Sequence, residues 1–250
     1  MNYFKKTAAF FMSIIMLISI HAFVAPVFAE DLVEPPMNES LMEKEKTEPK
    51  IISEVLEKRD EYTKHFYMSD GTFLATEFTL PVHFKTENGD WVEYDNTLEQ
   101  QGDEDTGVYT TVLSNHPTSL AIKAAPDRTA SIDDSEYPIS WGYEGAKSSK
   151  LRIDDKNVHK QGNEKSTSLD SLTSSAKYKN LFPHVDLEYI IDSTGVKENL
   201  ILKNKNAANE FVVDYRIGNL NVRKKDNQTV ELINENEETI YMISAPKMYD

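Results

Sequence analysis

The chain has no cysteine among its 250 residues. This absence excludes disulfide bridges, a thiolate metal site and a lipidated N-terminal cysteine. Basic residues are also scarce, because 27 Lys and Arg stand against 42 Asp and Glu and the formal net charge is −15. Such a chain repels phosphate backbones, and no basic patch with interleaved aromatics compensates. The composition therefore predicts a protein held by its core alone, with no nucleic-acid partner.

Long hydrophobic runs are absent except at the N-terminus. There, Lys5 and Lys6 precede a mostly apolar run over residues 8–25, and Val-Phe-Ala at 27–29 suits a signal peptidase. We expect cleavage after Ala29; the alternative is an uncleaved anchor, since the run approaches the ~18 residues that span a bilayer. Cleavage removes two Lys and no acid, which changes the net charge from −15 to −17. The sequence thus predicts a secreted chain with no membrane partner after signal removal.

Catalytic motifs are missing as well. The sequence contains no G-x-S-x-G elbow, no H-E-x-x-H pair and no P-loop, and its six His residues are scattered singly. We therefore predict no catalytic, cofactor-binding or metal-ligating residues, and a protein that is not an enzyme.

The sequence does contain an alternation of apolar and polar residues with a period of two, from Glu61 onward. It is clearest from Val185 to Ile191, and it resumes at Val196 after the turn-forming Asp-Ser-Thr-Gly at 192–195. This pattern predicts a β-hairpin with one dry face. Similar strands recur every ~8–12 residues, with turn residues such as Asn-Gly at 88–89 between them. The fold class is therefore predicted to be all-β, with mainly antiparallel, sandwich-like sheets.

Composition divides the chain into five segments. These are a signal peptide (1–29), a flexible linker (30–58), a first β-rich segment (59–146), a polar Ser-rich loop (147–175) and a second β-rich segment (176–250) packed with the first. Residues 51–59 form either a short helix or the lead-in to the first strand.

Four blocks of the sequence carry a family resemblance. They are SDGTFLATEFTLPVHFKTENGDWVEYDNTL, YPISWGYEG, YKNLFPHVDLEYIIDSTGVKENLIL and SAPKMYD. Together, over residues 59–250, they resemble the N-terminal region of large secreted Gram-positive surface proteins: wall-associated, RHS/YD-repeat and DNRLRE-domain-containing proteins. The resemblance implies a β-rich preface to further modules and a truncated chain. It also implies a cell-wall location, with wall polymer or downstream domains of a longer polypeptide as partners.

Aromatic residues in strands are the first candidates for ligand contact. Trp91, Trp141 and Tyr143, together with Tyr94 and Tyr137, could form a platform on which sugars stack. Aromatic residues in strands are more often core residues or cross-strand pairs, so both interpretations stay open.

Glu198 is the most informative carboxylate. It shares parity with Val196, Leu200 and Leu202, so a regular strand would aim it at the core. An unpaired buried carboxylate is costly. We expect a bulge that turns it outward or a buried Lys or Arg partner, in preference to a raised pKa at a functional site.

Other acidic residues suggest metal sites only weakly. His184, Asp186 and Glu188 would lie on one strand face, which is expected to be the solvated face. The acidic runs at 103–105, 133–134 and 154–155 lack the spacing of a calcium loop. Calcium, bridging the acidic chain to an anionic wall, is the one cofactor left open.

Two functions follow from these observations. The first is a non-catalytic secreted β module that structures or anchors part of a larger surface protein. The second is a carbohydrate-binding or glycan-cleaving domain, which would need two carboxylates ~5–10 Å apart beside exposed aromatics.

Overall fold

A computed structural model describes residues 48–153 and 172–249. The expected signal peptide, most of the linker and the middle of the Ser-rich loop lie outside the described residues. Every strand pair in the described ranges is antiparallel, which confirms the predicted all-β fold class. No helix in these ranges is long and apolar enough to cross a membrane.

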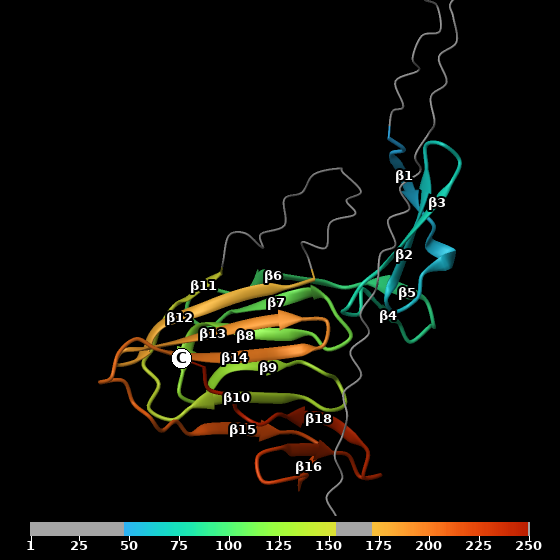
Figure 1. Ribbon diagram of the computed structural model, residues 1–250. Helices are drawn as coiled ribbons and strands as arrows, with labels where there is room; N and C mark the ends of the chain where they lie inside the picture. The colour runs from blue at the N-terminus through green and yellow to red at the C-terminus, as the bar shows by residue number, and fades with distance from the viewer. Residues whose placement is uncertain (1–47, 154–171, 250) are drawn as a thin grey trace, which may run out of the picture. The chain divides into compact units, whose positions relative to one another are not determined.

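Five sheets make up the described chain (Figure 1). The largest has the order β15-β10-β9-β8-β7-β6, and a four-stranded sheet has the order β11-β12-β13-β14. Two three-stranded sheets, β1-β2-β3 and β16-β17-β18, and the pair β4-β5 complete the fold. The strands are β1 (Ile51–Glu54), β2 (Thr63–Met68), β3 (Phe73–Glu77), β4 (His83–Lys85), β5 (Trp91–Glu93), β6 (Asp95–Gln101), β7 (Val108–Leu113), β8 (Thr118–Ala125), β9 (Arg128–Ile132), β10 (Ile139–Tyr143), β11 (Leu151–Ile153), β12 (Ser174–Phe182), β13 (Val185–Asp192), β14 (Gly195–Leu202), β15 (Val213–Ile217), β16 (Asn221–Lys224), β17 (Val230–Ile233) and β18 (Thr239–Ile243).

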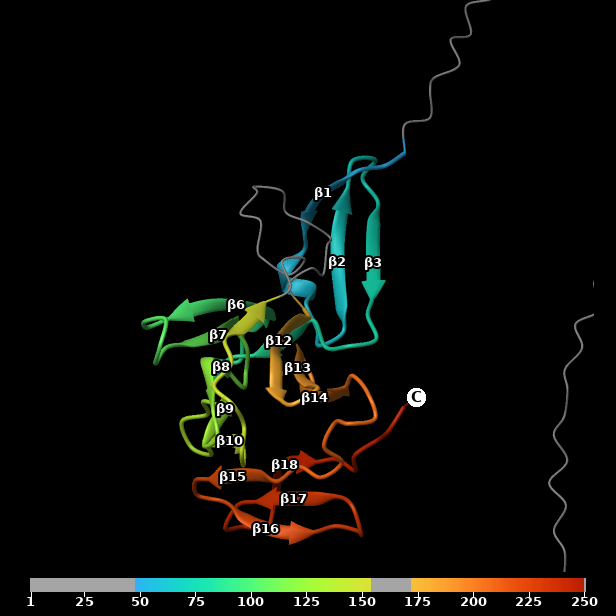
Figure 2. The same cartoon turned by 90° about the vertical axis from the view of Figure 1, so that its left-hand side faces the viewer.

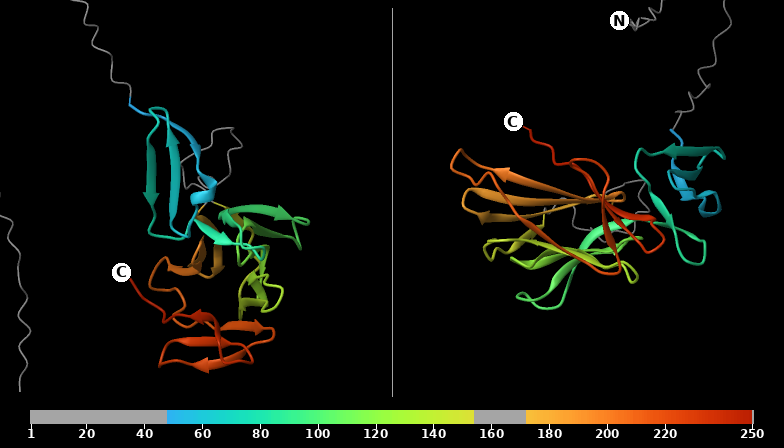
Figure 3. Two further views of the ribbon diagram at one scale, coloured as in Figure 1. Left: turned by 90° about the vertical axis from the view of Figure 1, so that its right-hand side faces the viewer. Right: turned by 90° about the horizontal axis from the view of Figure 1, so that it is seen from below.

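The four-stranded sheet packs face to face on the six-stranded sheet, as Figures 1 and 3 show. Side chains join the two layers: the Tyr178 hydroxyl of β12 donates to the Ala121 carbonyl of β8, and the Tyr189 hydroxyl of β13 lies 2.7 Å from Thr129 Oγ1 of β9. Both tyrosines are fully buried. The described chain therefore contains a β-sandwich with one main core.

The hairpin at 185–202 forms as the sequence predicts. Val185 pairs with Leu202 and Asp192 with Gly195, without interruption between them. The inward residues Val185, Leu187, Tyr189 and Ile191 are all less than 3% exposed. Gly195 adopts a φ of 146°, which favours glycine, and Asp192 accepts a hydrogen bond from the Thr194 amide.

The six-stranded sheet is completed by a strand from late in the chain. β15 pairs with β10, from Ile139 opposite Ile217 to Tyr143 opposite Val213. Figure 2 shows β15 at this edge, near the small sheet β16-β17-β18. Leu220 and Leu232 add that small sheet to the main core.

Residues 51–59 contain a strand and a short turn, and the helix that was one of the two alternatives does not form. β1 pairs with β2, and a single 3-10 turn follows at Leu56–Lys58. The turn buries none of its residues, so nothing in the packing extends it into a helix.

Candidate functional site

Glu198 lies on β14 directly opposite Tyr189 of β13, and its side chain points toward the sandwich interior. The Trp141 indole of β10 donates a hydrogen bond to Glu198 Oε1 at 2.7 Å. The inward direction follows from the uninterrupted register of the hairpin. The expected bulge is therefore wrong. The expected ion pair is wrong too, because the partners of Glu198 in the described chain are aromatic residues.

Aromatic rings surround this carboxylate. Trp141 stacks on Tyr215 at 5.8 Å between centroids and meets Tyr189 edge-on at 6.5 Å. Tyr143 and Tyr189 are less than 3% exposed. We call Trp141, Tyr143, Tyr189, Glu198 and Tyr215 the Glu198 cluster.

Burial raises the pKa of Glu198 above its ordinary value, and hydrogen bonds from Trp141, Tyr189 and Tyr143 offset part of that rise. Burial also raises the pKa of Tyr143, and the Glu198 charge adds to the effect. A carboxylic acid of raised pKa can serve in proton transfer, but that role needs access to a substrate.

The Glu198 cluster does not form a sugar-stacking platform. Trp141 is 4% exposed and Tyr143 is 2% exposed, so neither presents a ring face to a ligand. This corrects the expectation that they face a ligand: both inward faces of the sandwich need large apolar side chains. Trp91, the fourth candidate, lies elsewhere, on β5, and is half-buried.

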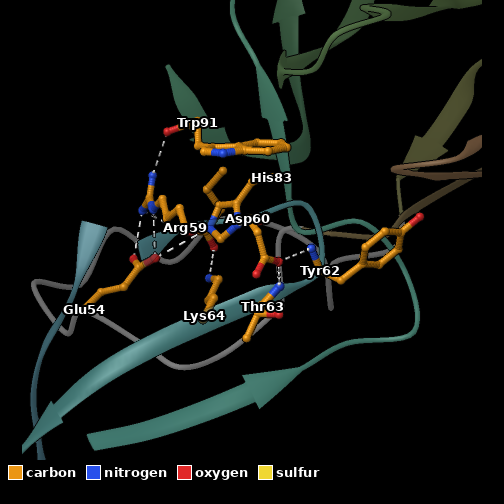
Figure 4. A network of polar contacts seen from close by, with 9 residues as sticks. Glu54, Arg59, Asp60, Tyr62, Thr63, Lys64, His83 and Trp91 are labelled. Atoms are coloured by element: carbon orange, nitrogen blue, oxygen red, sulfur yellow. Dashed lines mark hydrogen bonds and ion pairs between the residues drawn. The ribbon is translucent and has the colours of Figure 1, made fainter. Parts of the chain in front are cut away.

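A second polar cluster lies where β1, β2, β4 and β5 meet (Figure 4). Arg59 binds both carboxylate oxygens of Glu54 at 2.8 Å and approaches Glu93 at 3.8 Å. Lys64 donates to Glu93 as well. We call Glu54, Arg59, Lys64, His83 and Glu93 the His83 cluster. Its two acids and two bases cancel in charge while His83 is neutral.

His83 is the most enclosed member of this cluster, at 0% exposed. Its Nδ1 lies 2.6 Å from the Asp60 carbonyl oxygen, so Nδ1 carries the proton and donates. Its Nε2 faces Glu54 Oε1 at 3.5 Å and has no hydrogen bond within the described residues. Burial lowers the pKa of His83, and the bond to Asp60 opposes that shift.

The ion pairs of the His83 cluster join β1, β2 and β5. Lys64 and His83 are at most 1% exposed, so nearly all of each side chain is enclosed by protein. None of these residues was among the candidates predicted from sequence. One pattern could have identified one of them: Lys64 shares strand parity with the buried Phe66, which places a cation on an inward face.

A pocket of about 250 Å³ lies beside the second cluster. Exposed Glu61, Lys85 and Asn115, half-buried Phe84 and Trp91, and buried Tyr94 and His83 line it. We call it the Trp91 pocket. It is the place where a candidate from the sequence, Trp91, borders open space.

The carboxylates considered for metal binding have other partners. Asp186 pairs with Lys203 at 2.6 Å and accepts the Asn180 amide, whereas Glu188 pairs with Lys177 at 3.2 Å. Asp103 accepts hydrogen bonds from the Thr106 hydroxyl and from the amides of its own turn, and these bonds lower its pKa to about 2. The described residues contain no group of three or more His, Asp or Glu placed to hold a metal ion. Residues 154–155 lie outside the described ranges.

Comparison with known proteins finds relatives named for the cell wall and for tRNA. The tRNA nuclease WapA of Bacillus subtilis strain 168 is 23% identical over 267 residues, which cover 99% of this chain and 11% of the nuclease. The tRNA3(Ser)-specific nuclease WapA of Bacillus spizizenii is 22% identical and covers 90% of the chain. The Wall-associated protein of Geobacillus stearothermophilus is 25% identical over 79% of this chain and 74% of its own length. No family model matches, and no solved structure matches.

These relatives correct the prediction that the protein is not an enzyme. Three matched proteins are named as tRNA nucleases, and the similarity runs along nearly the whole chain. That prediction rested on missing local motifs, which are weak evidence against catalysis because catalytic groups often come together only in space. This chain spans about a tenth of the length of the nucleases that it matches. The names support the wall-associated part of the family resemblance.

Proposed function

We propose that this chain is a secreted, wall-bound β-rich module of a larger bacterial surface protein. The observation that carries the proposal is the similarity to the Wall-associated protein of Geobacillus stearothermophilus, which includes about three quarters of that protein. Residues 48–153 and 172–249 fold into sheets, and no helix among them is long and apolar enough to cross a membrane.

Fractionation of the producing cells and sedimentation of purified protein with cell walls test this proposal. We expect the chain in the wall fraction, and we expect the purified chain to sediment with isolated walls in a saturable manner. A chain found only in the cytoplasm, or one that stays in the supernatant at every wall concentration, would contradict the proposal.

The second candidate function is cleavage of tRNA, which the printed names of three relatives favour. Incubation of the purified chain with bulk tRNA, followed by gel analysis of the products, tests whether this segment has the activity itself. Discrete fragments that appear in proportion to enzyme concentration would establish it. Intact tRNA would assign the activity of the relatives to the nine tenths of their length that this chain does not span.

A further inference from the structure

The Trp91 pocket combines ring faces with polar groups. Phe84 packs against Tyr94 with ring centroids 4.8 Å apart, and Lys85 Nζ lies 4.9 Å from the centroid of the Trp91 ring. The backbone of Trp91 is anchored to the His83 cluster, because its carbonyl accepts a hydrogen bond from Arg59. Rigid aromatic faces of this kind pack against the C–H faces of sugar rings.

Tyr94 orients the side-chain amide of Asn115 in this pocket. Its hydroxyl donates to Asn115 Oδ1 at 3.0 Å, and Tyr94 is 4% exposed. Burial raises the pKa of Tyr94 to about 12, which moves it further above neutral pH, and the hydroxyl keeps its proton there. The Asn115 carbonyl is therefore engaged, and its amide nitrogen, which makes no hydrogen bond within the described residues, stays available as a donor.

The charges at the pocket favour a neutral ligand. Glu61 supplies an exposed carboxylate and Lys85 an exposed ammonium, so the two charges cancel. The chain as a whole carries a net charge of −15, which repels polyanions. A phosphate-rich polymer would find one cation here, beside an acid.

We propose that the Trp91 pocket binds one N-acylated sugar ring of a cell-wall glycan. An acylamino group presents an N–H that Glu61 can accept, a carbonyl that Asn115 can donate to, and a methyl group that can pack on Trp91. The inference rests on the proposed wall association and names the component of the wall that is recognised.

Titration of the purified chain with soluble oligomers of N-acetylglucosamine tests the proposal. The chain has two Trp residues, and Trp141 is buried and bonded to Glu198, so a fluorescence change reports on Trp91. We expect a saturable change. By calorimetry, we expect Trp91→Ala and Asn115→Ala each to bind about tenfold or more weakly, equivalent to about 1.4 kcal/mol. Tyr67→Ala removes an exposed aromatic side chain outside the pocket and should bind like the unchanged protein.

Matched measurements separate this proposal from wall association. Glucose oligomers without acylamino groups should bind at least tenfold more weakly, and equal binding would overturn the choice of ligand. Unchanged affinity in Trp91→Ala and Asn115→Ala, with urea midpoints showing that both fold, would overturn the pocket. Sedimentation with walls but no binding of N-acetylglucosamine oligomers would contradict the pocket proposal and support wall association. Binding of the oligomers without sedimentation would support the pocket and contradict wall association.

Discussion

Glu198 holds a carboxyl group against four aromatic rings, and this position makes stability depend on pH. Because burial raises its pKa in the folded chain, the unfolded chain loses this proton first as pH rises above about 4.5. The Glu198 contribution to stability is thus present below that pH and is lost as pH rises through the folded pKa.

We therefore predict that Glu198→Gln stabilises the protein at neutral pH. The amide keeps an acceptor for Trp141 and removes the cost of the buried charge. Between about pH 4.5 and the pKa of Glu198 in the folded chain, the difference in unfolding free energy between the variant and the unchanged protein should grow by about 1.4 kcal/mol per pH unit. Urea denaturation at a series of pH values measures it. Glu188→Gln, on the outward side of β13, is the control, and an equal pH response in both variants would contradict the prediction.

His83 should give the opposite dependence. Its pKa is lowered in the folded chain, so the unfolded chain binds the proton first as pH falls below about 6.5. Stability from neutral His83 is then lost as pH falls through that range. We expect His83→Gln to cost stability at pH 7.5 and to close part of the gap with the unchanged protein at pH 5.5.

Urea midpoints at the two pH values check this. The control is His184→Asn, because His184 lies in a turn with φ of 64°, which Asn tolerates. A gap for His83→Gln that stays constant with pH would show that His83 does not titrate in this range.

At the scale of elements, Arg59 joins β1 to β5 through Glu54, Glu93 and the Trp91 carbonyl. Removing it leaves two partly buried acids facing Lys64 alone. We predict that Arg59→Ala lowers the free energy of unfolding by about 3 kcal/mol. Arg216→Ala breaks an exposed pair with Asp127 and should cost less than about 1 kcal/mol. Comparable losses in the two variants, measured by urea unfolding, would refute the role given to Arg59.

The hairpin β13–β14 offers a test of the predicted dry face. Leu187 is fully buried, whereas Leu202, which pairs with Val185 at the open end of the hairpin, is 49% exposed. Leu187→Ala should cost about 3 kcal/mol because it leaves a cavity in the core. Leu202→Ala should cost less than half of that. Thermal and urea unfolding of both variants decide whether the sandwich core or the hairpin alone stabilises this region.

Strands were predictable from sequence where apolar alternation and turn residues coincide. β13 and β14 satisfy both conditions, and so does the pair β4–β5 around Asn88-Gly89. β6 and β9 were missed, because their buried positions include Asn96, Thr97 and Thr129, polar residues that hide the alternation. The buried Asn96 amide donates to the Leu172 carbonyl, a contact between residues far apart in the sequence.

The candidate sites show the same limit. Parity correctly aims Glu198 inward, but its partner Trp141 comes from another sheet, which no local pattern identifies. Lys64 was visible on an inward parity, yet its partner Glu93 depends on how β2 packs against β5. Local sequence determines where a side chain points; long-range packing determines what it meets.

At the scale of the whole molecule, the net charge of −15 opposes binding to an anionic wall. We propose that divalent cations bridge the two surfaces, as they bind carboxylates from several sides. Sedimentation with cell walls should then weaken severalfold when a chelator is added and recover with excess calcium. Equal sedimentation with and without the chelator would rule out this bridge.

The pairing of β10 with β15 has a consequence for the order of assembly. Ile139 of β10 pairs with Ile217 of β15. During synthesis from the N-terminus, the β10 edge of the six-stranded sheet therefore stays unpaired until residue 217 has been made. Contacts this distant in sequence slow folding. The sheet therefore stays incomplete until most of the chain has been made, and β15 then covers the open edge of β10.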